Sequence, residues 1–231
     1  MTYKLTLFDL DYTLLPLDSD HAWGEFTTTL GWTDVQAFKQ RNDAFYAAYQ
    51  AGTLDIHDYV RFATAAVRAQ GPVAARQAQA RFLQEVIEPA ITPQARALVQ
   101  AHQQAGDAVV VVTATNEFVT RPIAQRLGVD ELIAVELAHG PDGWITGEIQ
   151  GTPSFREGKV QRVAEWLRAR GLDWSGVEIT FYSDSMNDLP LLERAAHPVA
   201  TNPDERLRTL ARARGWRILD LFRQEHKEEH A

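Results

Sequence analysis

The second half of the chain alternates helix-forming segments with short apolar runs, and no other feature of the sequence limits the fold as strongly. A helical pattern over residues 93–105 is followed by an apolar run over 109–113 and by a second helical pattern over 117–127. Alternating helices and strands predict a parallel sheet that is covered by helices. The unbroken valines suit a central strand, because a sheet covered on both faces has no wet side for polar residues. We therefore expect an α/β fold with a doubly wound, mainly parallel sheet.

The segments that follow continue this alternation. The sequence Gly140-Pro141-Asp142-Gly143 separates two strand-like stretches and predicts a small hairpin. Gly171 is suited to end a helix. The expected elements are strands over 133–138 and 144–149, a helix over 158–170, a strand over 177–182, an acidic turn over 183–188, a helix over 189–195, short strands near Val199 and Ile218 on either side of a basic helix over 203–214, and a polar, frayed tail over 224–231.

A long helical segment separates the first strand from the rest of this pattern. Residues 5–8 form a short apolar run, and residues 16–88 carry helix-forming residues with aromatic side chains at helical spacing. Ten of the 22 aromatic residues lie in this third of the sequence, which predicts an all-α module with its own core. We expect a core domain of residues 1–15 and 91–231 and an inserted helical cap domain of residues 16–90.

Composition narrows the functional classes. The chain has 23 Lys and Arg against 31 Asp and Glu, and a net charge of −8 disfavours binding to a nucleic-acid backbone. The absence of cysteine excludes zinc–thiolate sites, iron–sulfur clusters and cysteine nucleophiles. No apolar run approaches the ~20 residues of a membrane helix, and Asp9 interrupts the start of the chain too early for a signal peptide. We expect no nucleic-acid or membrane partner and a cytoplasmic location; the oligomeric state stays open.

Two aspartates follow the first strand at a spacing of two residues. Side chains at positions i and i+2 of an extended chain point the same way, so Asp9 and Asp11 face one small volume, where like charge raises one of their pKa values. An ionised carboxylate is a candidate nucleophile, and a protonated one is a candidate general acid. The alternative is that this Asp-x-Asp pair is only a turn element.

A second acidic cluster, which contains Asp184 and Asp188, follows another predicted strand. Ligands of doubly wound sheets bind beyond the carboxyl ends of the strands, so both clusters are expected at one site. Two carboxylates about 4 Å apart repel by roughly 4 kcal/mol at an effective dielectric of about 20, and a bound cation would relieve this repulsion. All the candidate ligands are oxygens, which favours Mg²⁺ over zinc. The alternative is that Asp188 caps the following helix.

Two further segments offer contacts for a phosphate group. Thr113 ends the valine run, and the loop through Ala114 leads to a predicted helix start, where a hydroxyl and backbone N–H groups suit an anion. Lys159 lies at the start of another predicted helix, where a positive charge is unfavourable because it opposes the helix dipole. An ion pair with a bound anion would explain a lysine at this position. Each residue also has an ordinary explanation, namely β-propensity for Thr113 and a solvated surface position for Lys159.

The order of these motifs is more specific than any one of them. The segment Asp9-Leu10-Asp11-Tyr12-Thr13 after an apolar strand is followed by Thr113, Lys159 and the segment Ser183-Asp184-Ser185-Met186-Asn187-Asp188. This succession resembles the haloacid dehalogenase superfamily of phosphohydrolases nearly from end to end of the core domain. The helical segment looks like the type-one cap of subfamily IB, the phosphoserine phosphatase-like branch.

The resemblance implies a role for each acidic residue. Asp9 would form an aspartyl-phosphate, and Asp11 would protonate the leaving oxygen and later act as base on water. Mg²⁺ would be held by the Asp9 carboxylate, the Asp11 backbone carbonyl and the Asp184 side chain, with Asn187 and Asp188 nearby. Phosphoryl transfer depends mostly on positioning and charge neutralisation, which such a site supplies.

The implied activity is the Mg²⁺-dependent hydrolysis of a small phosphomonoester. Thr113, Ala114 and Lys159 would bind the phosphoryl oxygens. Phosphoserine phosphatases carry Ser-Gly-Gly-Phe where this chain has Thr-Ala-Thr-Asn over 113–116, whereas relatives with similar motifs are assigned as histidinol-phosphate phosphatases. Histidinol phosphate and phosphoserine are therefore the candidate substrates.

Charged and aromatic residues of the cap are candidate specificity residues. Those just after the first strand suit a cationic or aromatic alcohol phosphate, and the alternative is that they only begin a cap helix and pack its core. The candidates are Asp18, Asp20, Trp23, Glu25, Arg41 and Arg61.

Two other functions stay open at this point. A phosphomutase would use the same aspartyl-phosphate and return the phosphoryl group to the product. A non-enzymatic phospho-acceptor or binding module would store the phosphoryl group as a signal. Asp11 disfavours such a module, because a base beside the nucleophile shortens the lifetime of the phosphoenzyme.

Overall fold

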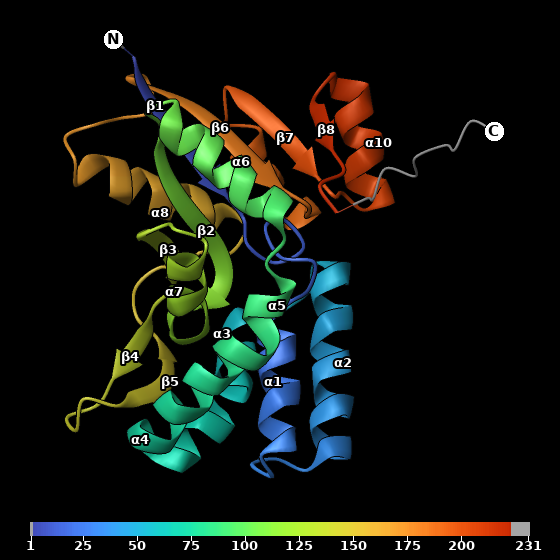
Figure 1. The fold of residues 1–231 in the computed structure, drawn as a ribbon, viewed down its shortest axis with the longest axis vertical. Helices are drawn as coiled ribbons and strands as arrows, with labels where there is room; N and C mark the ends of the chain where they lie inside the picture. The colour runs from blue at the N-terminus through green and yellow to red at the C-terminus, as the bar shows by residue number, and fades with distance from the viewer. Residues whose placement is uncertain (1, 223–231) are drawn as a thin grey trace.

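The centre of the molecule is a six-stranded sheet in which all neighbouring strands run parallel (Figure 1). The computed structural model describes residues 2–222, so the tail expected over 224–231 lies outside the described residues. The chain runs outward from β1 to β3 and then returns to the other side of β1, which confirms the doubly wound α/β fold. In spatial order the strands are β3 (Glu131–Val135), β2 (Ala108–Asn116), β1 (Tyr3–Phe8), β6 (Val177–Ser183), β7 (His197–Thr201) and β8 (Arg217–Leu219).

Helices cover both faces of this sheet. Val109 and Val111 of β2 belong to the buried cluster that contains α6 and α7, and Val110 and Val112 belong to the cluster that contains α8, α9 and α10. All four valines are buried, which confirms a central strand with no wet side. The helices are α6 (Pro93–Gln104) and α7 (Glu117–Arg126) on one face, and α8 (Glu157–Arg168), α9 (Leu189–Leu192) and α10 (Glu205–Arg214) on the other.

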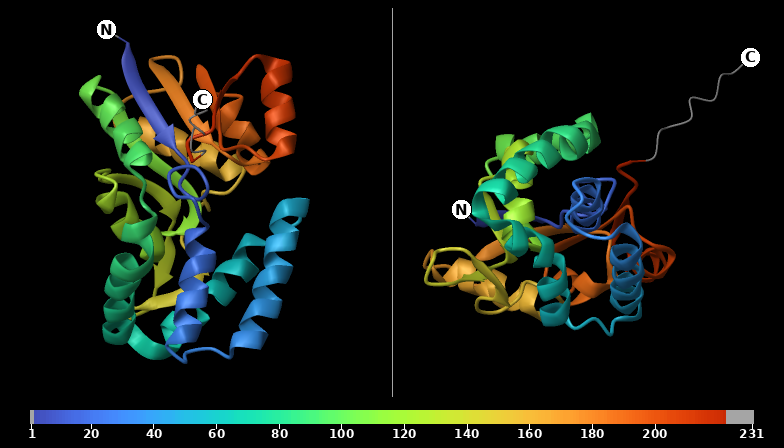
Figure 2. Two further views of the ribbon diagram at one scale, coloured as in Figure 1. Left: turned by 45° about the vertical axis from the view of Figure 1, so that its right-hand side comes forward. Right: turned by 90° about the horizontal axis from the view of Figure 1, so that it is seen from below.

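The helical segment after β1 lies beyond the carboxyl ends of the strands (Figure 2). Its first three helices begin after Asp18, Asp34 and Asp55, whose side chains accept hydrogen bonds from backbone N–H groups of the first turn. The elements are α1 (Ser19–Thr29), α2 (Val35–Ala51), α3 (Ile56–Ala63), α4 (Ala65–Phe82), which is kinked at Gly71, a π-helical turn (Leu83–Ile87) and α5 (Glu88–Ala90). The division into two domains stays a prediction.

The helical segment does not have the separate core that its aromatic residues suggest. Trp23, Phe26 and Phe82 share one buried cluster with Phe8 and Val111 of the central sheet. The reason is that α1 packs against α7 and β2 as well as against α4. The expectation of an independent helical core is therefore wrong.

A two-stranded hairpin lies beside the helical segment (Figure 1). Strands β4 (Leu137–His139) and β5 (Ile145–Ile149) are antiparallel, and β5 packs against α3 and α4. The turn over 140–143 is confirmed by a hydrogen bond from the Gly140 N–H to the Trp144 carbonyl, 2.8 Å long. The single strand expected over 133–138 is wrong, because this apolar run is divided at Glu136 between the central sheet and the hairpin.

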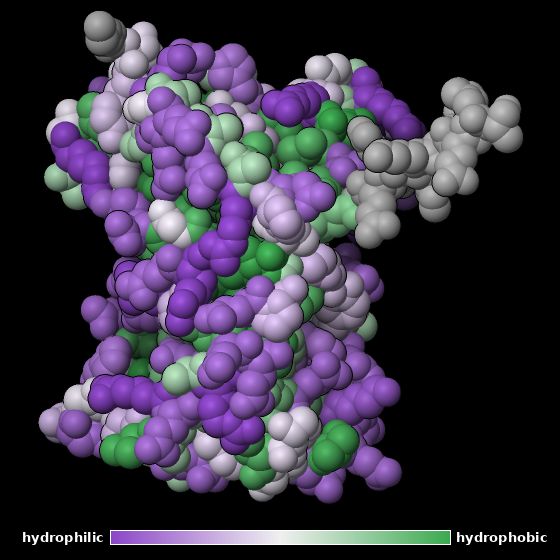
Figure 3. Space-filling view, in the orientation of Figure 1, coloured by the Kyte–Doolittle hydropathy of each residue, from purple (hydrophilic) through white to green (hydrophobic). Residues whose placement is uncertain are grey.

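The face drawn in Figure 3 is mostly hydrophilic, and its hydrophobic residues occur in small, separate groups. The large hydrophobic side chains instead gather in the two buried clusters on either side of the sheet. Within residues 2–222, no helix combines the length and the hydropathy that crossing a membrane requires.

We expect Gly24→Ala to lower the free energy of unfolding by about 1–3 kcal/mol, because a methyl group does not fit between α1 and α2. A Cβ atom at Gly24 would lie 2.0 Å from Cζ of Phe38, whose ring already stacks on Phe62 at 5.2 Å. Urea unfolding measures the change.

Gly176→Ala is the matched control for this substitution. A Cβ atom at Gly176 meets nothing closer than 3.8 Å, so its effect should stay within about 0.5 kcal/mol. Alanine is intrinsically the better helix former. A Gly24→Ala protein that is more stable than the wild type would therefore contradict the close approach of the two helices.

Candidate active site

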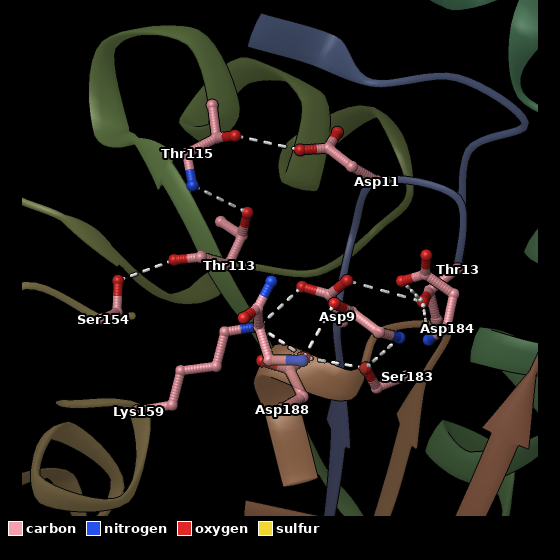
Figure 4. Close-up of polar contacts among 12 residues, drawn as sticks. Asp9, Asp11, Thr13, Thr113, Thr115, Ser154, Lys159, Ser183, Asp184 and Asp188 are labelled. Atoms are coloured by element: carbon pink, nitrogen blue, oxygen red, sulfur yellow. Dashed lines mark hydrogen bonds and ion pairs between the residues drawn. The ribbon is translucent and has the colours of Figure 1, made fainter. Parts of the chain in front are cut away.

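The residues expected at the site come together where parallel strands end (Figure 4). Asp9 directly follows β1, and its N–H donates to the Tyr182 carbonyl of β6 at 2.9 Å. Asp184 directly follows β6. These residues line a cavity of about 720 Å³ between the strand ends and the helical segment, together with Asp11, Thr113 and others.

A buried lysine joins two of these strand ends. Lys159 lies in the first turn of α8 and is only 2% exposed. Its Nζ donates to Asp9 Oδ1 at 2.8 Å and to Asp188 Oδ2 at 2.7 Å (Figure 4). Burial alone would lower the pKa of Lys159, but the carboxylates of Asp188 and Asp9 outweigh burial and hold this pKa above its ordinary value. The lysine is therefore charged, and its interpretation as a solvated surface residue is wrong.

Asp188 serves this ion pair and does not cap the next helix. Its Oδ2 accepts hydrogen bonds from Lys159 and from the Ser183 hydroxyl, the latter at 2.7 Å. No side-chain hydrogen bond joins Asp188 to the N–H groups of α9. The capping alternative is therefore wrong, and α9 ends at Leu192, earlier than the residue 195 expected.

One hydroxyl group lies between the carboxylates of Asp9 and Asp184. Thr13 Oγ1 is 3.5 Å from Asp9 Oδ2 and 3.3 Å from Asp184 Oδ1, and it accepts a hydrogen bond from the Asp184 N–H at 3.1 Å. Burial is the largest cause that raises the pKa of Asp9, to about 6, whereas Lys159 lowers it. Burial, followed by the charges of Asp9 and Asp188, raises the pKa of Asp184 well above its ordinary value. Thr13 stands in the first motif, but its role could not be assigned from the sequence.

Asp11 faces a different group of partners from Asp9. Its Oδ2 accepts from the Thr115 hydroxyl at 2.9 Å (Figure 4). Its Oδ1 accepts from the Ser19 N–H at 2.8 Å. Burial, followed by the charge of Asp18, raises the pKa of Asp11 well above its ordinary value. The expectation that like charge raises the pKa of one of the two carboxyl groups is wrong in its cause, because burial is the largest cause for both and raises the pKa of both.

Thr113 lies inside β2 and not at its end. The strand continues to Asn116, which caps α7 by accepting from the Val119 N–H. The expectation that a helix start with free N–H groups lies next to Thr113 is therefore wrong. Thr113 Oγ1 accepts from the Thr115 N–H at 3.1 Å, and its carbonyl accepts from the Ser154 hydroxyl at 2.6 Å. The Thr113 hydroxyl can still donate its own proton toward the cavity, which it lines together with its neighbour Ala114.

The carboxyl groups of the site do not form a cluster of three or more metal-binding side chains. Residues 2–222 hold no group of three or more His, Cys, Asp or Glu side chains that could bind a metal ion. The expected Mg²⁺ site needs fewer, since it uses the side chains of Asp9 and Asp184 and the backbone carbonyl of Asp11.

Of the expected specificity residues, only Asp18 reaches the cavity. Its carboxylate also caps α1, accepting from the N–H groups of Asp20 and His21 at 3.0 and 2.9 Å. Asp20 is 6% exposed and points toward β2, where it accepts from Asn116 Nδ2 at 3.3 Å.

The other four candidates lie away from the cavity, because each packs or pairs elsewhere. Trp23 is buried in the shared core, and Glu25 pairs with His21 at 3.4 Å. Arg41 lies 5.0 Å from the centre of the Phe62 ring, and Arg61 pairs with Asp58 and Glu148. The alternative, that such residues pack the core of the cap, does not describe Glu25 and Arg61 either, because both side chains are exposed.

Contacts between the cap and the acidic loop were not expected from the sequence. The Tyr49 hydroxyl lies 3.0 Å from Ser185 Oγ, and Asn187 Nδ2 donates to the Tyr49 carbonyl at 3.3 Å. Asn187 Oδ1 in turn accepts from Arg156 Nε at 3.2 Å. The last turn of α2 therefore rests on the loop that carries Asp184 and Asp188.

Comparison with known proteins shows the family of the chain. The family model for haloacid dehalogenase-like hydrolases matches residues 6–193. The chain belongs to this family. It is 42% identical over 219 residues to a protein of Neisseria meningitidis named histidinol-phosphatase. The match covers 94% of this chain and 99% of the relative. The chain is accordingly a phosphatase of the haloacid dehalogenase family.

Two solved structures share this fold. A crystal structure of a Bordetella pertussis Tohama I protein of unknown function is 46% identical, with a TM-score of 0.90, and the match covers 96% of this chain and 100% of that one. A substrate-bound phosphoserine phosphatase complex has a TM-score of 0.65 at 18% identity, and the match covers 95% of this chain and 93% of that one. The second likeness concerns the fold alone.

We expect Asp20→Asn to flatten the pH dependence of stability between about pH 4 and 7. Burial, followed by the charge of Asp18, raises the pKa of Asp20 from 3.8 to about 7. The folded protein therefore holds a proton here that the unfolded chain has lost, so stability falls as the pH rises through this window. The substitution should remove on the order of 2–4 kcal/mol of that fall.

Urea unfolding at several pH values measures this effect. Asp43→Asn is the matched control, because Asp43 is exposed on α2 and should leave the slope unchanged. An Asp20→Asn protein whose stability falls as steeply as that of the wild type would contradict a protonated Asp20.

Proposed function

We propose that this phosphatase hydrolyses a small phosphomonoester in two steps, with Asp9 as the nucleophile and Mg²⁺ as the cofactor. The observation that carries the proposal is the buried Lys159, whose Nζ lies 2.8 Å from Asp9 Oδ1. A fixed positive charge at this point keeps Asp9 ionised and attracts a phosphate dianion. Membership of the haloacid dehalogenase-like hydrolases supports the proposal.

In the first step the Asp9 carboxylate attacks the phosphorus atom. A bond forms between a carboxylate oxygen and phosphorus as the bond from phosphorus to the alcohol oxygen breaks, which leaves an aspartyl-phosphate. Asp11 gives its proton to the departing oxygen. Its raised pKa supports this role, since a buried carboxyl group near Asp18 retains its proton.

In the second step Asp11 acts as a base. It takes a proton from a water molecule, whose oxygen attacks phosphorus and releases Asp9 and inorganic phosphate. The hydrogen bonds from the Ser19 N–H and the Thr115 hydroxyl hold the Asp11 carboxylate in place for both steps. Asp9 and Asp11 thus divide the chemistry, one as nucleophile and the other as proton carrier.

Mg²⁺ fits the donors of the site. Oxygen atoms of Asp9 and Asp184 both lie within 3.5 Å of Thr13 Oγ1, and each carboxyl group contains hard oxygen ligands of the kind that Mg²⁺ prefers. The Asp11 backbone carbonyl would complete the protein ligands. When bound, the cation would neutralise charge on the phosphate and on the two carboxylates.

The other expected residues surround the same volume. Thr113, Ala114 and Lys159 line the cavity and would bind the phosphoryl oxygens. Asp188 holds Lys159 in position, and Asn187 joins the acidic loop to the cap. The proposed substrate is a small-molecule phosphomonoester, and a cytoplasmic location stays a prediction.

Histidinol phosphate is the first substrate to test. The relative named histidinol-phosphatase matches this chain over nearly the full length of both proteins. Asp18 places a carboxyl group on the cap side of the cavity, which suits an alcohol that carries an ammonium group or an imidazolium ring. Phosphoserine is the second candidate, and its carboxylate makes it less compatible with this side.

We expect the protein to release phosphate from phosphomonoesters with Mg²⁺, and a chelator to abolish this release. Asp9→Asn should lower kcat by at least about 1000-fold, because an amide is a far poorer nucleophile than a carboxylate. A phosphate-release assay measures both effects, with Asp43→Asn as the matched control. Activity that survives in Asp9→Asn would refute the nucleophile assignment.

The same assay separates the alternatives. A phosphomutase would pass the phosphoryl group back to the product and release little inorganic phosphate. A phospho-acceptor module would keep an acid-stable label for many minutes. Rapid release of one phosphate for each ester consumed favours the hydrolase over both.

A further inference from the structure

Two exposed aromatic side chains lie at the cavity. Tyr12 is 40% exposed and Tyr46 is 43% exposed, so they are among the few large hydrophobic side chains of residues 2–222 that remain open to solvent. Both line the cavity, Tyr12 from the loop after β1 and Tyr46 from α2. An exposed ring in a cavity gains free energy when a ligand covers it.

The backbone holds Tyr12 in an uncommon conformation. Its φ of 54° is rare for a residue other than glycine and persists only where neighbours fix it. The Tyr12 N–H donates to the Leu17 carbonyl at 3.2 Å, and its carbonyl accepts from Asn202 Nδ2 at 2.8 Å. These contacts hold the ring beside the cavity directly after Asp11.

A carboxylate lines the cavity together with the two rings. Asp18 directly follows Leu17, whose carbonyl accepts the Tyr12 N–H at 3.2 Å, so Tyr12 and Asp18 belong to adjoining parts of the loop after β1. Asp11, which the proposed function places at the leaving oxygen, lines the same cavity.

Cationic side chains line the cavity as well, and each is held by another part of the protein. Lys159 binds Asp9 and Asp188, Arg156 donates through Nε to Asn187, and Arg206 donates to the Gln50 carbonyl. Asp18 instead accepts from the backbone N–H groups of Asp20 and His21, so its carboxyl group takes part in none of these three contacts. Such surroundings favour a flat group that carries a positive charge, because cations are attracted to aromatic faces as well as to carboxylates.

We propose that Tyr12, Tyr46 and Asp18 form an aromatic clamp that selects leaving alcohols with a flat, cationic ring. The inference rests on the proposed function, since it concerns the alcohol part of the substrate of the same site. The rings cover the two faces of the substrate ring, and Asp18 balances its charge. The clamp residues are specificity residues and take no part in the transfer of the phosphoryl group.

Three phosphate esters separate the contributions of ring and charge. Histidinol phosphate has an ammonium group and a flat ring that can carry a charge, phenyl phosphate has a neutral ring and no cation, and phosphoethanolamine has an ammonium group without a ring. We expect Tyr46→Leu to lower the ratio of kcat/KM for histidinol phosphate to that for phosphoethanolamine about 10-fold, mostly through KM. Tyr46→Phe keeps the ring and should hold this ratio within about 2-fold.

Asp18→Asn tests the charge without removing the helix cap. Asparagine caps a helix about as well as aspartate, so α1 should still form. We expect the ratio of kcat/KM for histidinol phosphate to that for phenyl phosphate to fall about 10-fold at a pH where the imidazole is protonated. Tyr3→Leu is the control, because Tyr3 is exposed at the far end of β1, and both ratios should remain unchanged.

Binding of the intact esters tests the clamp independently of turnover. In an Asp9→Asn background, calorimetry should show that Tyr46→Leu weakens the binding of histidinol phosphate about 10-fold relative to phosphoethanolamine. Equal losses for both esters, or unchanged ratios in Tyr46→Leu and Asp18→Asn, overturn the clamp. A wild-type protein that releases no phosphate from any ester overturns the proposed function instead, and the binding ratios still decide the clamp.

Discussion

The buried ion pairs of Lys159 are the interaction on which the rest of the site depends. Removing an ammonium group and two carboxylates from water is costly, and the cost is offset only when the charges are close and well hydrogen-bonded. Lys159 meets this condition by contacting Asp9 and Asp188 at 2.8 and 2.7 Å, while Ser183 donates to the same Asp188 oxygen. These contacts join β1, α8 and the loop after β6, so the fold of the sheet and the position of the proposed nucleophile are determined together.

Neutral hydrogen-bond donors fix the remaining acidic groups. Thr13 lies between Asp9 and Asp184, whereas Thr115 and the Ser19 N–H turn Asp11 toward the cap. This difference in surroundings is what allows two carboxyl groups two residues apart to take different roles in the proposed reaction. The cap completes the site through Tyr49, which rests on the acidic loop, and through Tyr46, which lines the cavity.

The sequence predicts the parts of the molecule that depend on local pattern. The valines of β2 indicate a strand buried on both faces, and the rule that ligands bind at the carboxyl ends of parallel strands brings Asp9 and Asp184 to one cavity. Features that depend on packing between distant segments could not be predicted from local patterns. No local sequence signal shows that the apolar run is divided at Glu136. The local sequence also does not show whether Asp188 caps a helix or forms an ion pair. For the same reason, spacing did not show that Trp23 is buried in the shared core while Asp18, five residues earlier, faces the cavity.

A double-mutant cycle on Lys159 and Asp188 tests the central claim most directly. The quantity to measure is the free energy of unfolding of Lys159→Met, Asp188→Asn and the double variant, at pH 8 and without divalent cations. Lys159→Met alone should destabilise the protein by about 3–5 kcal/mol, because it leaves buried carboxylates without their counterion. The double variant should lose at least about 1 kcal/mol less than the two single losses together. Single losses that add to within about 0.3 kcal/mol would contradict the account, because the buried lysine would then not be what holds the acidic site together.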